Sequence, residues 1–573
     1  MSAAVLPAAR RELAEPGRRS FGRWFLLPWL LLSVLGMLWA LATPIGGSPD
    51  EPAHVVKAAS VVRGELLPES MIVTGGVLHV PAAVAWEYQQ GCFPFHPETP
   101  ASCAPPFTGD PNEIVETYSS ASLYNPAYYV LVGWPSLIVP GTEAIYAMRL
   151  VSVLLCSFFI AASFWMIGSW RSHRAPTLGV LIGLTPIVLY LLGTVNPNAL
   201  EFAGGLALFT GMLGITLQPN PRLLGSRLTI VVIAAALVSN TRGISPLWVA
   251  VLLALPLLLL TGRELGALLK RPGVIVSILL IAITAVASVV WTQASNSLGT
   301  APSSGPDVAP PNEGVGLTPL DGFLGMINGF YLQARQMVGI LGWLDTTFDP
   351  SVYYISFGLV GLLVLGVLVW VRGRALVFVV ALGLAFFFLP AIVQAAFVTR
   401  GGFIWQGRYT LVLALALLIG MAACIGASPR FQRWRRGRWL LTAFAWLAAA
   451  AWAYCAIYAF FTTLRRFTSG YYTEWTAMLD TGSWVPPLGV IPLGALFVLA
   501  VVGLAVTVVL LGRDRLVEVP VAPPAADPHD PFATMIYGTG YDAPVGYGTP
   551  PGHGAPTAFP NDNRYPDRKA PQW

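Results

Sequence analysis

The sequence has few charged residues. Of its 573 residues only 11% are Asp, Glu, Lys or Arg and 55% are hydrophobic, whereas about 25% are charged in an ordinary soluble domain. So few charges could not cover the surface of a water-soluble protein of this length, and so many hydrophobic residues exclude a disordered chain. The net charge of +5 is not gathered into a basic domain, which excludes a nucleic-acid-binding protein. The composition therefore predicts a polytopic membrane protein.

Cysteine is scarce as well, and the motifs of soluble enzymes are missing. The chain has five cysteines, too few for a disulfide scaffold, and it contains no P-loop, dinucleotide-binding fingerprint or CxxC pair. Cys156, Cys424 and Cys455 lie in apolar runs, where a thiol packs as a small apolar group. Cys92 and Cys103 lie in a segment that we place outside the membrane, where a disulfide is expected and two free thiols are the alternative.

Long apolar runs, by contrast, are abundant. Crossing a bilayer takes about 20 apolar residues in a helix, and the sequence has ten clear runs of this kind together with a longer one, 226–261, that we interpret as a hairpin of two spans. The ten runs occupy residues 24–43, 144–168, 176–194, 198–217, 273–291, 351–371, 375–397, 409–427, 439–461 and 488–511. The predicted fold is therefore all-α, with about twelve transmembrane helices.

Charge decides whether a further aromatic run, 124–140, also crosses. Short cytoplasmic loops collect Lys and Arg, and the segment 1–23 is basic, which places the N-terminus inside. The later basic loops also fall inside only if 124–140 does not span. We therefore expect this run to form a juxtamembrane or re-entrant helix at the outer interface.

This topology gives a cytoplasmic N-terminal tail, a membrane domain over 24–511, and a Pro- and Gly-rich tail over 512–573 that is predicted to be disordered and cytoplasmic. The long outer loops are 44–143, 292–350 and 462–487. Because the inner loops are short, we expect the protein to work on the extracytoplasmic face of the plasma membrane.

Two adjacent carboxylates, Asp50 and Glu51, follow the first predicted span directly. Carboxylates beside a bilayer are costly unless they are solvated or take part in function. Asp50 also suits the N-cap of a helix with Pro52 in its first turn. The pair is therefore either a functional site or a cap with a solvated neighbour. His54 and Lys57 share the polar face of this helix. The residues expected to face lipid are Val55, Val56, Ala59 and Val62.

Several other polar residues stand at outer ends of spans. Arg242 lies at the tip of the hairpin, and Arg408 lies at the start of a span. Each could bind a phosphate or merely extend its charged group to the membrane–water interface. Arg335 lies in an amphipathic stretch that could equally be a surface helix. Asn196 and Asn198 could cap the next helix or bind sugar hydroxyls, and Asp345 is a further outer candidate.

The box at residues 49–54, Pro-Asp-Glu-Pro-Ala-His, resembles the DUF2142 family of bacterial membrane proteins, and five more motifs follow in matching order over about 24–511. They are Asn125-Pro126-Ala127-Tyr128-Tyr129, Arg149-Leu150-Val151-Ser152, Val195-Asn196-Pro197-Asn198, Gly342-Trp343-Leu344-Asp345 and Gln406-Gly407-Arg408-Tyr409. Asn198 departs from the pattern, which has Asp at this place, and this argues against a metal or base role there.

That family in turn is similar to the GT-C glycosyltransferases, which carry an acidic pair in the first outer loop and juxtamembrane helices before the second span. The resemblance implies a sugar transfer from a polyprenyl-phosphate donor to an envelope glycan, glycolipid or protein. It implies that Asp50 is the general base or a ligand of a divalent cation such as Mg²⁺, Mn²⁺ or Ca²⁺, with Glu51 as its partner. The Ala-, Arg- and Pro-rich composition resembles actinobacterial proteins, which suggests arabinofuranose or mannose as the sugar.

Three alternatives remain at this point, and one of them is a non-catalytic assembly scaffold. A lipid-linked sugar flippase or transporter would show repeated halves and polar groups near the midplane of the membrane, and we find no convincing repeat. A glycan polymerase or ligase would share the outer site and the lipid donor, but it would rely on outer Arg and His more than on an acidic pair.

Overall fold

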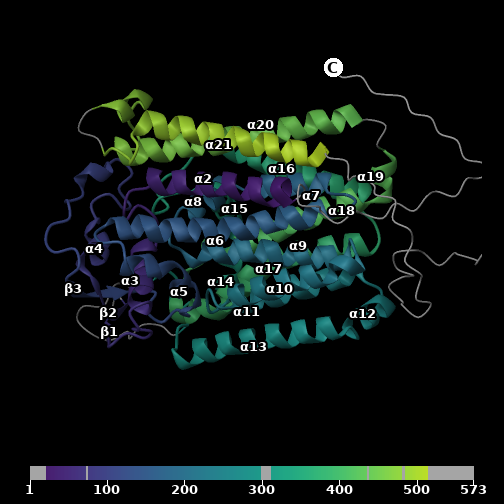
Figure 1. Cartoon of the computed structure of the whole chain (residues 1–573), viewed down its shortest axis with the longest axis horizontal. Coiled ribbons are helices and arrows are strands. Elements are labelled where there is room, and N and C mark those ends of the chain that lie inside the picture. Colours follow the sequence, from purple (N-terminus) through teal and green to yellow (C-terminus); the bar gives the residue numbers. More distant parts are fainter. Residues whose placement is uncertain (1–20, 73–74, 299–311, 435–437, 481–483, 514–573) are drawn as a thin grey trace, which may run out of the picture.

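The computed structural model of the chain describes residues 21–72, 75–298, 312–434, 438–480 and 484–513. Its long helices lie side by side, and loops, short helices and three strands cover one end of the bundle (Figure 1). We call this end, which carries residues 44–143, the loop end. The opposite end, which we call the basic end, carries the Arg-rich connections 169–173, 217–223, 260–271, 371–373 and 428–434. The predicted tails at 1–23 and 512–573 lie almost wholly outside the described residues.

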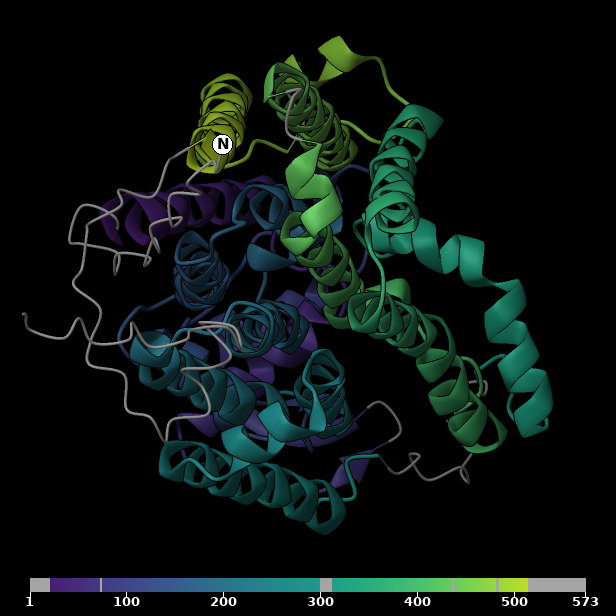
Figure 2. The same ribbon diagram turned by 90° about the vertical axis from the view of Figure 1, so that its right-hand side faces the viewer.

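Ten of the described helices are long and apolar enough to cross a membrane, which confirms the all-α polytopic fold. Each coincides with a predicted apolar run, and the α20–α21 pair and α13 lie at opposite edges of the bundle (Figure 2). The ten are η1–α2 (Gly22–Ala42), α6 (Glu143–Gly168), α9 (Pro197–Thr216), η5–α10 (Pro221–Ser239), α13 (Pro272–Ala294), α16 (Pro350–Trp370), α17 (Arg374–Gly401), η7–α18 (Gly407–Ala427), the apolar part of α20 (Arg438–Thr468) and α21 (Val490–Arg513).

Two of the twelve predicted spans take other forms. The run 176–194 is broken into α7 (Arg174–Gly183) and α8 (Pro186–Leu192), whose axes differ by 73°. The break falls at the residue before Pro186, where the proline ring disfavours helical backbone. The second arm of the hairpin is the short apolar helix Ser245–Leu259, formed by α11 (Ser245–Ala254) and η6 (Leu255–Leu259). The described residues thus hold ten spans, or eleven with the bent pair, where about twelve were predicted.

The run 124–140 forms no span, as the charge pattern predicted. It folds into the short helices α5 (Ala127–Gly133) and η4 (Trp134–Leu137), which pack against α3 (Glu51–Val61) and α6. A Cβ atom at Gly133 would lie 2.2 Å from the backbone oxygen of Ala58. Only glycine therefore lets α5 cross α3 this closely.

The helix after the acidic pair is covered by protein. All residues of α3 are buried, and Val55, Val56 and Ala59 have no exposed surface, because α5 and two strands pack around the helix. The expectation that these side chains face lipid is therefore wrong. An amphipathic pattern gives the buried face of a helix, but it does not tell whether lipid or protein covers that face.

The sheet over α3 was not predicted from the sequence. Its strands β1 (Met71–Ile72), β2 (Gly75–Pro81) and β3 (Ile114–Ser119) pair antiparallel in the order β1-β2-β3. Along β2, Leu78 and Val80 are fully buried, whereas His79 between them is partly exposed, as the two-residue period of a strand requires. Short helices follow at α4 (Ala82–Ala85), η2 (Trp86–Gln89) and η3 (Ala101–Cys103).

The loop 44–143 is closed by the predicted disulfide and joined to the loops 292–350 and 462–487. Cys92 and Cys103 are bonded, with 6.2 Å between their Cα atoms. The fully buried guanidinium of Arg466 donates to the backbone oxygens of Phe93 and Thr99 at 2.6 and 2.7 Å and to Asp345 at 2.8 Å. One side chain at the end of α20 therefore joins the three long loops at the loop end. The second loop also contains α14 (Pro319–Asn328) and α15 (Phe330–Gly339), and the third contains η9 (Trp475–Leu479).

Candidate functional site

Asp50 lies immediately before α3 at the loop end. Its backbone is left-handed, with φ of 63°, a conformation that is costly for a residue with a Cβ atom. The backbone oxygen of Asp50 accepts a hydrogen bond from the His54 N–H at 3.2 Å, but the carboxylate does not cap the helix. The side chain instead pairs with Arg408 and keeps 44% of its surface exposed. The predicted cap is thus made by the backbone alone.

Arg408 reaches Asp50 from η7 (Gly407–Thr410), the turn that opens α18. The side chain of Gln336 on α15 fixes this turn by accepting a hydrogen bond from the Gly407 N–H at 2.6 Å. The guanidinium of Arg408 is almost fully buried, and within the described chain its Nε and Nη1 have no hydrogen-bond partner. Buried donors without partners are costly, so these two point to a ligand that accepts them.

Arg242 joins the same cluster from the turn between α10 and α11. Its Nη1 donates to the Asn198 side chain at 2.8 Å and lies 3.7 Å from the carboxylate of Glu201. The guanidinium groups of Arg242 and Arg408 stand 4.1 and 5.2 Å from the centre of the Tyr409 ring. Tyr409 therefore keeps two cations close together beside a single exposed carboxylate.

The electrostatics of the cluster favour an ionised Asp50. Burial opposes the charge, but the guanidinium of Arg408, with help from Arg242, outweighs it and holds the pKa of Asp50 below its ordinary value. Burial has the opposite consequence for His54, since it lowers the pKa of the imidazole to about 3. The neutral His54 ring contacts the Tyr129 hydroxyl at 2.9 Å. At neutral pH an ionised Asp50 and a neutral His54 therefore lie beside the guanidinium groups of Arg408 and Arg242.

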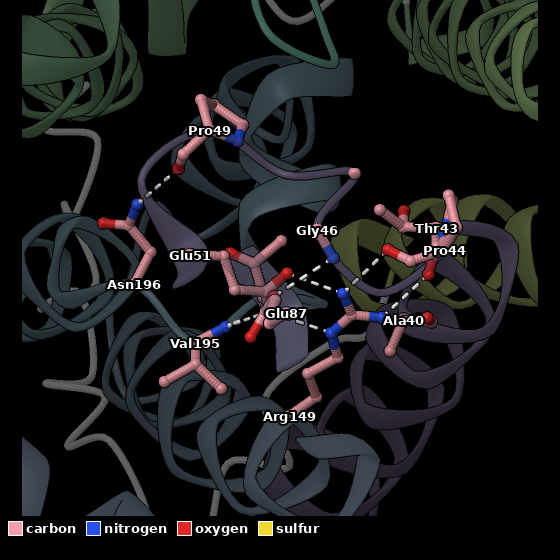
Figure 3. A network of polar contacts seen from close by, with 12 residues as sticks. Ala40, Thr43, Pro44, Gly46, Pro49, Glu51, Glu87, Arg149, Val195 and Asn196 are labelled. Atoms are coloured by element: carbon pink, nitrogen blue, oxygen red, sulfur yellow. Dashed lines mark hydrogen bonds and ion pairs between the residues drawn. The ribbon is translucent and has the colours of Figure 1, made fainter. Parts of the chain in front are cut away.

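Glu51, the neighbour of Asp50, has an entirely different environment. Arg149 on α6 donates to its two carboxylate oxygens at 2.8 and 2.6 Å, and the Val195 N–H adds a third hydrogen bond at 2.8 Å (Figure 3). Neither Glu51 nor Arg149 has any exposed surface. The remaining donors of Arg149 bind the backbone oxygens of Ala40, Thr43 and Pro44. The two carboxylates of the predicted acidic pair are therefore bound to separate partners.

A third carboxyl group, which the sequence analysis missed, lies beside this buried pair. Glu87 accepts a hydrogen bond from the Gly46 N–H at 3.1 Å, and its other oxygen is buried without a partner in the described chain (Figure 3). Burial, and then the charge of Glu51, raises the pKa of Glu87 well above its ordinary value. The surroundings of Glu87 therefore favour its neutral form. No motif marks it, because a lone Glu in a polar loop usually faces water.

The other predicted site residues divide between this cluster and the scaffold. Asn196 caps α9 by accepting from the Asn198 N–H at 3.0 Å, as one reading of the sequence expected. Lys57 is buried and donates to the backbone oxygens of Leu66 and Ser122. Arg335 stands over the ring of Tyr353 at 4.6 Å, and Asp345 pairs with Arg466. The last three hold loops in place and are not gathered around Asp50.

The expected divalent cation does not find a matching set of ligands. The described residues contain no group of three or more His, Cys, Asp or Glu side chains that could hold a metal ion. Mg²⁺ and Ca²⁺ need six or more oxygen ligands, and the oxygens of Glu51 are already bound to Arg149 and Val195. Asp50 and Glu51 therefore do not form a shared cation site in the described part of the chain.

One protein family matches most of the chain. The family described as a predicted membrane protein, DUF2142, matches residues 32–419, a range that includes Asp50, Arg242 and Arg408. No curated protein and no solved structure matches the chain.

Proposed function

The chain belongs to the DUF2142 family of predicted membrane proteins, and on this premise we propose that it is a membrane glycosyltransferase. It transfers a sugar from a polyprenyl-phosphate donor to a glycan, glycolipid or protein acceptor of the cell envelope. One observation carries the proposal. The accessible carboxylate of Asp50 lies at the loop end of a membrane bundle, beside a buried guanidinium with two donors that no described group accepts.

The reaction needs a base and an anion site. The oxygen of the acceptor hydroxyl bonds to the anomeric carbon of the donor sugar, while the bond from that carbon to the phosphate oxygen breaks and its electron pair leaves with the phosphate. The hydroxyl proton passes to Asp50, which acts as the general base. Because a polyprenyl phosphate is a good leaving group, the scheme assigns no general acid.

Arg408 and Arg242 supply the anion site. The Nε and Nη1 of Arg408, which no described group accepts, can each donate a charge-assisted hydrogen bond to an oxygen of the phosphate. Arg242, which stands 4.1 Å from the centre of the Tyr409 ring, adds a second positive charge. Because both groups are held in place before the donor binds, they stabilise the charge that grows on the departing phosphate without reorganising.

The ion pair between Asp50 and Arg408 gives the polyprenyl-phosphate sugar a second role. Without the polyprenyl-phosphate sugar, Arg408 holds the pKa of Asp50 low. A weakly basic carboxylate is a poor proton acceptor. When the negatively charged phosphate binds to the free Nε and Nη1 of Arg408, its charge offsets that of the guanidinium, and the pKa of Asp50 rises. The base therefore gains strength when the donor is in place.

Glu51 is assigned a positioning role. It is sealed from solvent and all its hydrogen bonds go to the scaffold, so it cannot meet a substrate. Through Arg149 it joins the start of α3 to the end of α2, and it thereby sets where Asp50 stands. The acidic pair thus combines one catalytic residue with one positioning residue.

The orientation of the site follows from charge and redox chemistry. The basic end suits the cytoplasmic face by the positive-inside rule, which places the loop end outside. The disulfide between Cys92 and Cys103 suits an oxidising compartment. We therefore place the transfer reaction on the extracytoplasmic face of the plasma membrane, where lipid-linked sugars and envelope acceptors meet.

The test uses purified full-length protein, a panel of radiolabelled polyprenyl-phosphate sugars and extracted envelope acceptors. The wild type should transfer label from one donor, and Asp50→Asn should transfer none while it still folds and inserts. Asp480→Asn, which changes an exposed carboxylate in the third loop, serves as the matched control and should keep full activity. Full transfer by Asp50→Asn would overturn the assignment of the base.

A lipid-linked sugar flippase is the second candidate, and the bent α7–α8 pair favours it. Transporters build their substrate sites from discontinuous helices, and this pair is broken by 73°. Liposomes that contain a labelled lipid-linked sugar separate the two functions. A flippase moves the label across the bilayer without an acceptor, whereas a glycosyltransferase releases it only when an acceptor is added.

A further inference from the structure

A second site lies at the basic end of the bundle, far from Asp50. Between α7, α16, α20 and α21 is a cavity of about 470 Å³, a volume within the range of small-molecule sites. Its walls include Ile425 near the end of α18, whereas Arg408 precedes the start of that helix. At 1.5 Å per residue the cavity therefore lies roughly 25 Å from Arg408 along the helix.

The walls of this cavity are almost entirely apolar, and they open to the side of the bundle. Leu362 and Leu365 line it and are also exposed, by 47% and 57%, among the outward-facing leucines and valines of α16. In a membrane-spanning bundle such a surface meets lipid tails. An acyl chain can therefore enter the cavity from the bilayer without crossing water.

Aromatic rings close the cavity toward the basic end. Trp370, at the end of α16, stacks edge-on with Phe431 at 5.0 Å and lies 5.6 Å from Trp434, and all three rings line the cavity. Tryptophan is enriched at the level of lipid headgroups. The basic end of the cavity therefore lies at the headgroup level, and its apolar interior extends toward the middle of the membrane.

The charged residues that line the cavity are cationic. Arg174 begins α7 and Arg513 ends α21, so both stand at the basic end of the cavity wall. The surrounding connections carry Arg and Lys, and Glu264 is the one acidic residue in those at 169–173, 217–223, 260–271, 371–373 and 428–434. A ligand with an anionic head and an apolar tail matches this combination, as basic pockets between helices do for anionic lipids.

We infer that this cavity binds one acyl chain of an anionic phospholipid from the leaflet at the basic end, with the lipid phosphate at Arg174 and Arg513. The site stands on its own cavity, helices and charges, so it does not depend on the proposed sugar transfer. It gives the protein a lipid-binding site separate from the one at the loop end.

Native mass spectrometry of the full-length protein tests this inference. The protein is purified in detergent and incubated with equal amounts of palmitoyl-oleoyl phosphatidylglycerol and the corresponding phosphatidylcholine. The wild type should retain one phosphatidylglycerol about ten-fold better than phosphatidylcholine, because charge-assisted hydrogen bonds favour the anionic head. The double variant Arg174→Ala, Arg513→Ala should lose this preference. Ala445→Trp, which fills the cavity, should lose retention of both lipids.

Arg263→Ala is the matched control, since Arg263 is exposed at the same end but does not line the cavity. It should retain lipid as the wild type does. Thermal unfolding and gel filtration check that each variant is folded. Retention of phosphatidylglycerol by folded Ala445→Trp, an unchanged preference in the double arginine variant, or no retained lipid in the wild type would each overturn the inference. Loss of sugar transfer in an Asp50 variant would leave it untouched.

Discussion

Two carboxylates that are adjacent in the sequence lie in opposite environments. Glu51 and Arg149 are both fully buried, and both carboxylate oxygens of Glu51 accept hydrogen bonds from Arg149. Asp50 is partly exposed, and its partner Arg408 keeps two donors without an acceptor in the described chain. Each pair joins one Arg to one acid, but the Glu51 pair is complete and the Asp50 pair is not. Unsatisfied groups, more than charge itself, therefore mark the place where a ligand fits.

The largest effect should come from breaking the complete pair. Glu51→Ala leaves the guanidinium of Arg149 buried without its anion, which costs about 3–5 kcal/mol. Thermal unfolding in detergent should therefore show a strong loss of stability for Glu51→Ala and a smaller loss for Asp50→Ala, because Asp50 is partly exposed and water can take the place of its carboxylate beside Arg408. The double variant Glu51→Leu, Arg149→Met should recover much of the loss, since it removes both charges. Equal destabilisation by the Asp50 and Glu51 variants would erase the contrast.

The next largest effect should come from replacing the guanidinium of Arg408 in the incomplete pair. Arg408→Lys keeps the charge but lacks the planar guanidinium whose Nε and Nη1 are free to donate to a phosphate while Nη2 holds Asp50. Charge-assisted hydrogen bonds are worth about 1.5–3 kcal/mol, so kcat/KM for the lipid donor should fall roughly ten- to hundred-fold. Steady-state kinetics with varied donor measures this change. Arg335→Lys is the control, because Arg335 stands over Tyr353 outside the cluster, and a similar loss there would argue against a phosphate at Arg408.

A smaller effect concerns pH. Ionised Asp50 is the active base, so activity is present above its pKa and is lost as the pH falls through it. Because Arg408 holds that pKa below its ordinary value, the wild type should keep its kcat/KM down to about pH 4. In Arg408→Gln the pKa of Asp50 rises, and the acidic limb of the remaining activity should move to higher pH. An unmoved limb would show that another group is the base.

The smallest effect should follow from loosening Arg242. Asn198→Ala removes the acceptor that holds Nη1 of Arg242 at 2.8 Å, while Glu201 and Tyr409 stay in place. A hydrogen bond contributes about 0.5–1.5 kcal/mol, so KM for the donor should rise about two- to ten-fold with little change in kcat. Asn198→Asp, which keeps an acceptor at the same place, should restore the wild-type KM. A change in kcat alone would separate Arg242 from donor binding.

The apolar runs predicted the membrane helices well, because long hydrophobic stretches have few alternatives in a bilayer. The charge of the basic loops correctly kept 124–140 out of the membrane. The sheet at Gly75–Pro81 was missed, since its alternating pattern covers only a few residues within a long polar loop. The disulfide could be predicted because Cys92 and Cys103 are the two cysteines outside apolar runs.

The candidate site was predicted only in part, because pairing across long distances in the chain leaves no local pattern. Asp50, Arg242 and Arg408 were each singled out, but the sequence does not tell that they meet. It suggested that Asp50 and Glu51 act together, whereas their partners, Arg408 and Arg149, stand on different helices. Glu87 gave no signal at all, because its pKa depends on burial by distant segments.

The spacing of the two pairs along the chain sets the order in which they arise during synthesis. Glu51 and Arg149 are 98 residues apart, whereas Asp50 and Arg408 are 358 apart. Since a chain emerges and folds from its N-terminus, Glu51 has its partner as soon as α6 is made. Asp50 waits until most of the helices have been inserted. A truncated or stalled chain therefore contains the pair of Glu51 and Arg149 but lacks the pair of Asp50 and Arg408. Only a nearly full-length chain contains both pairs.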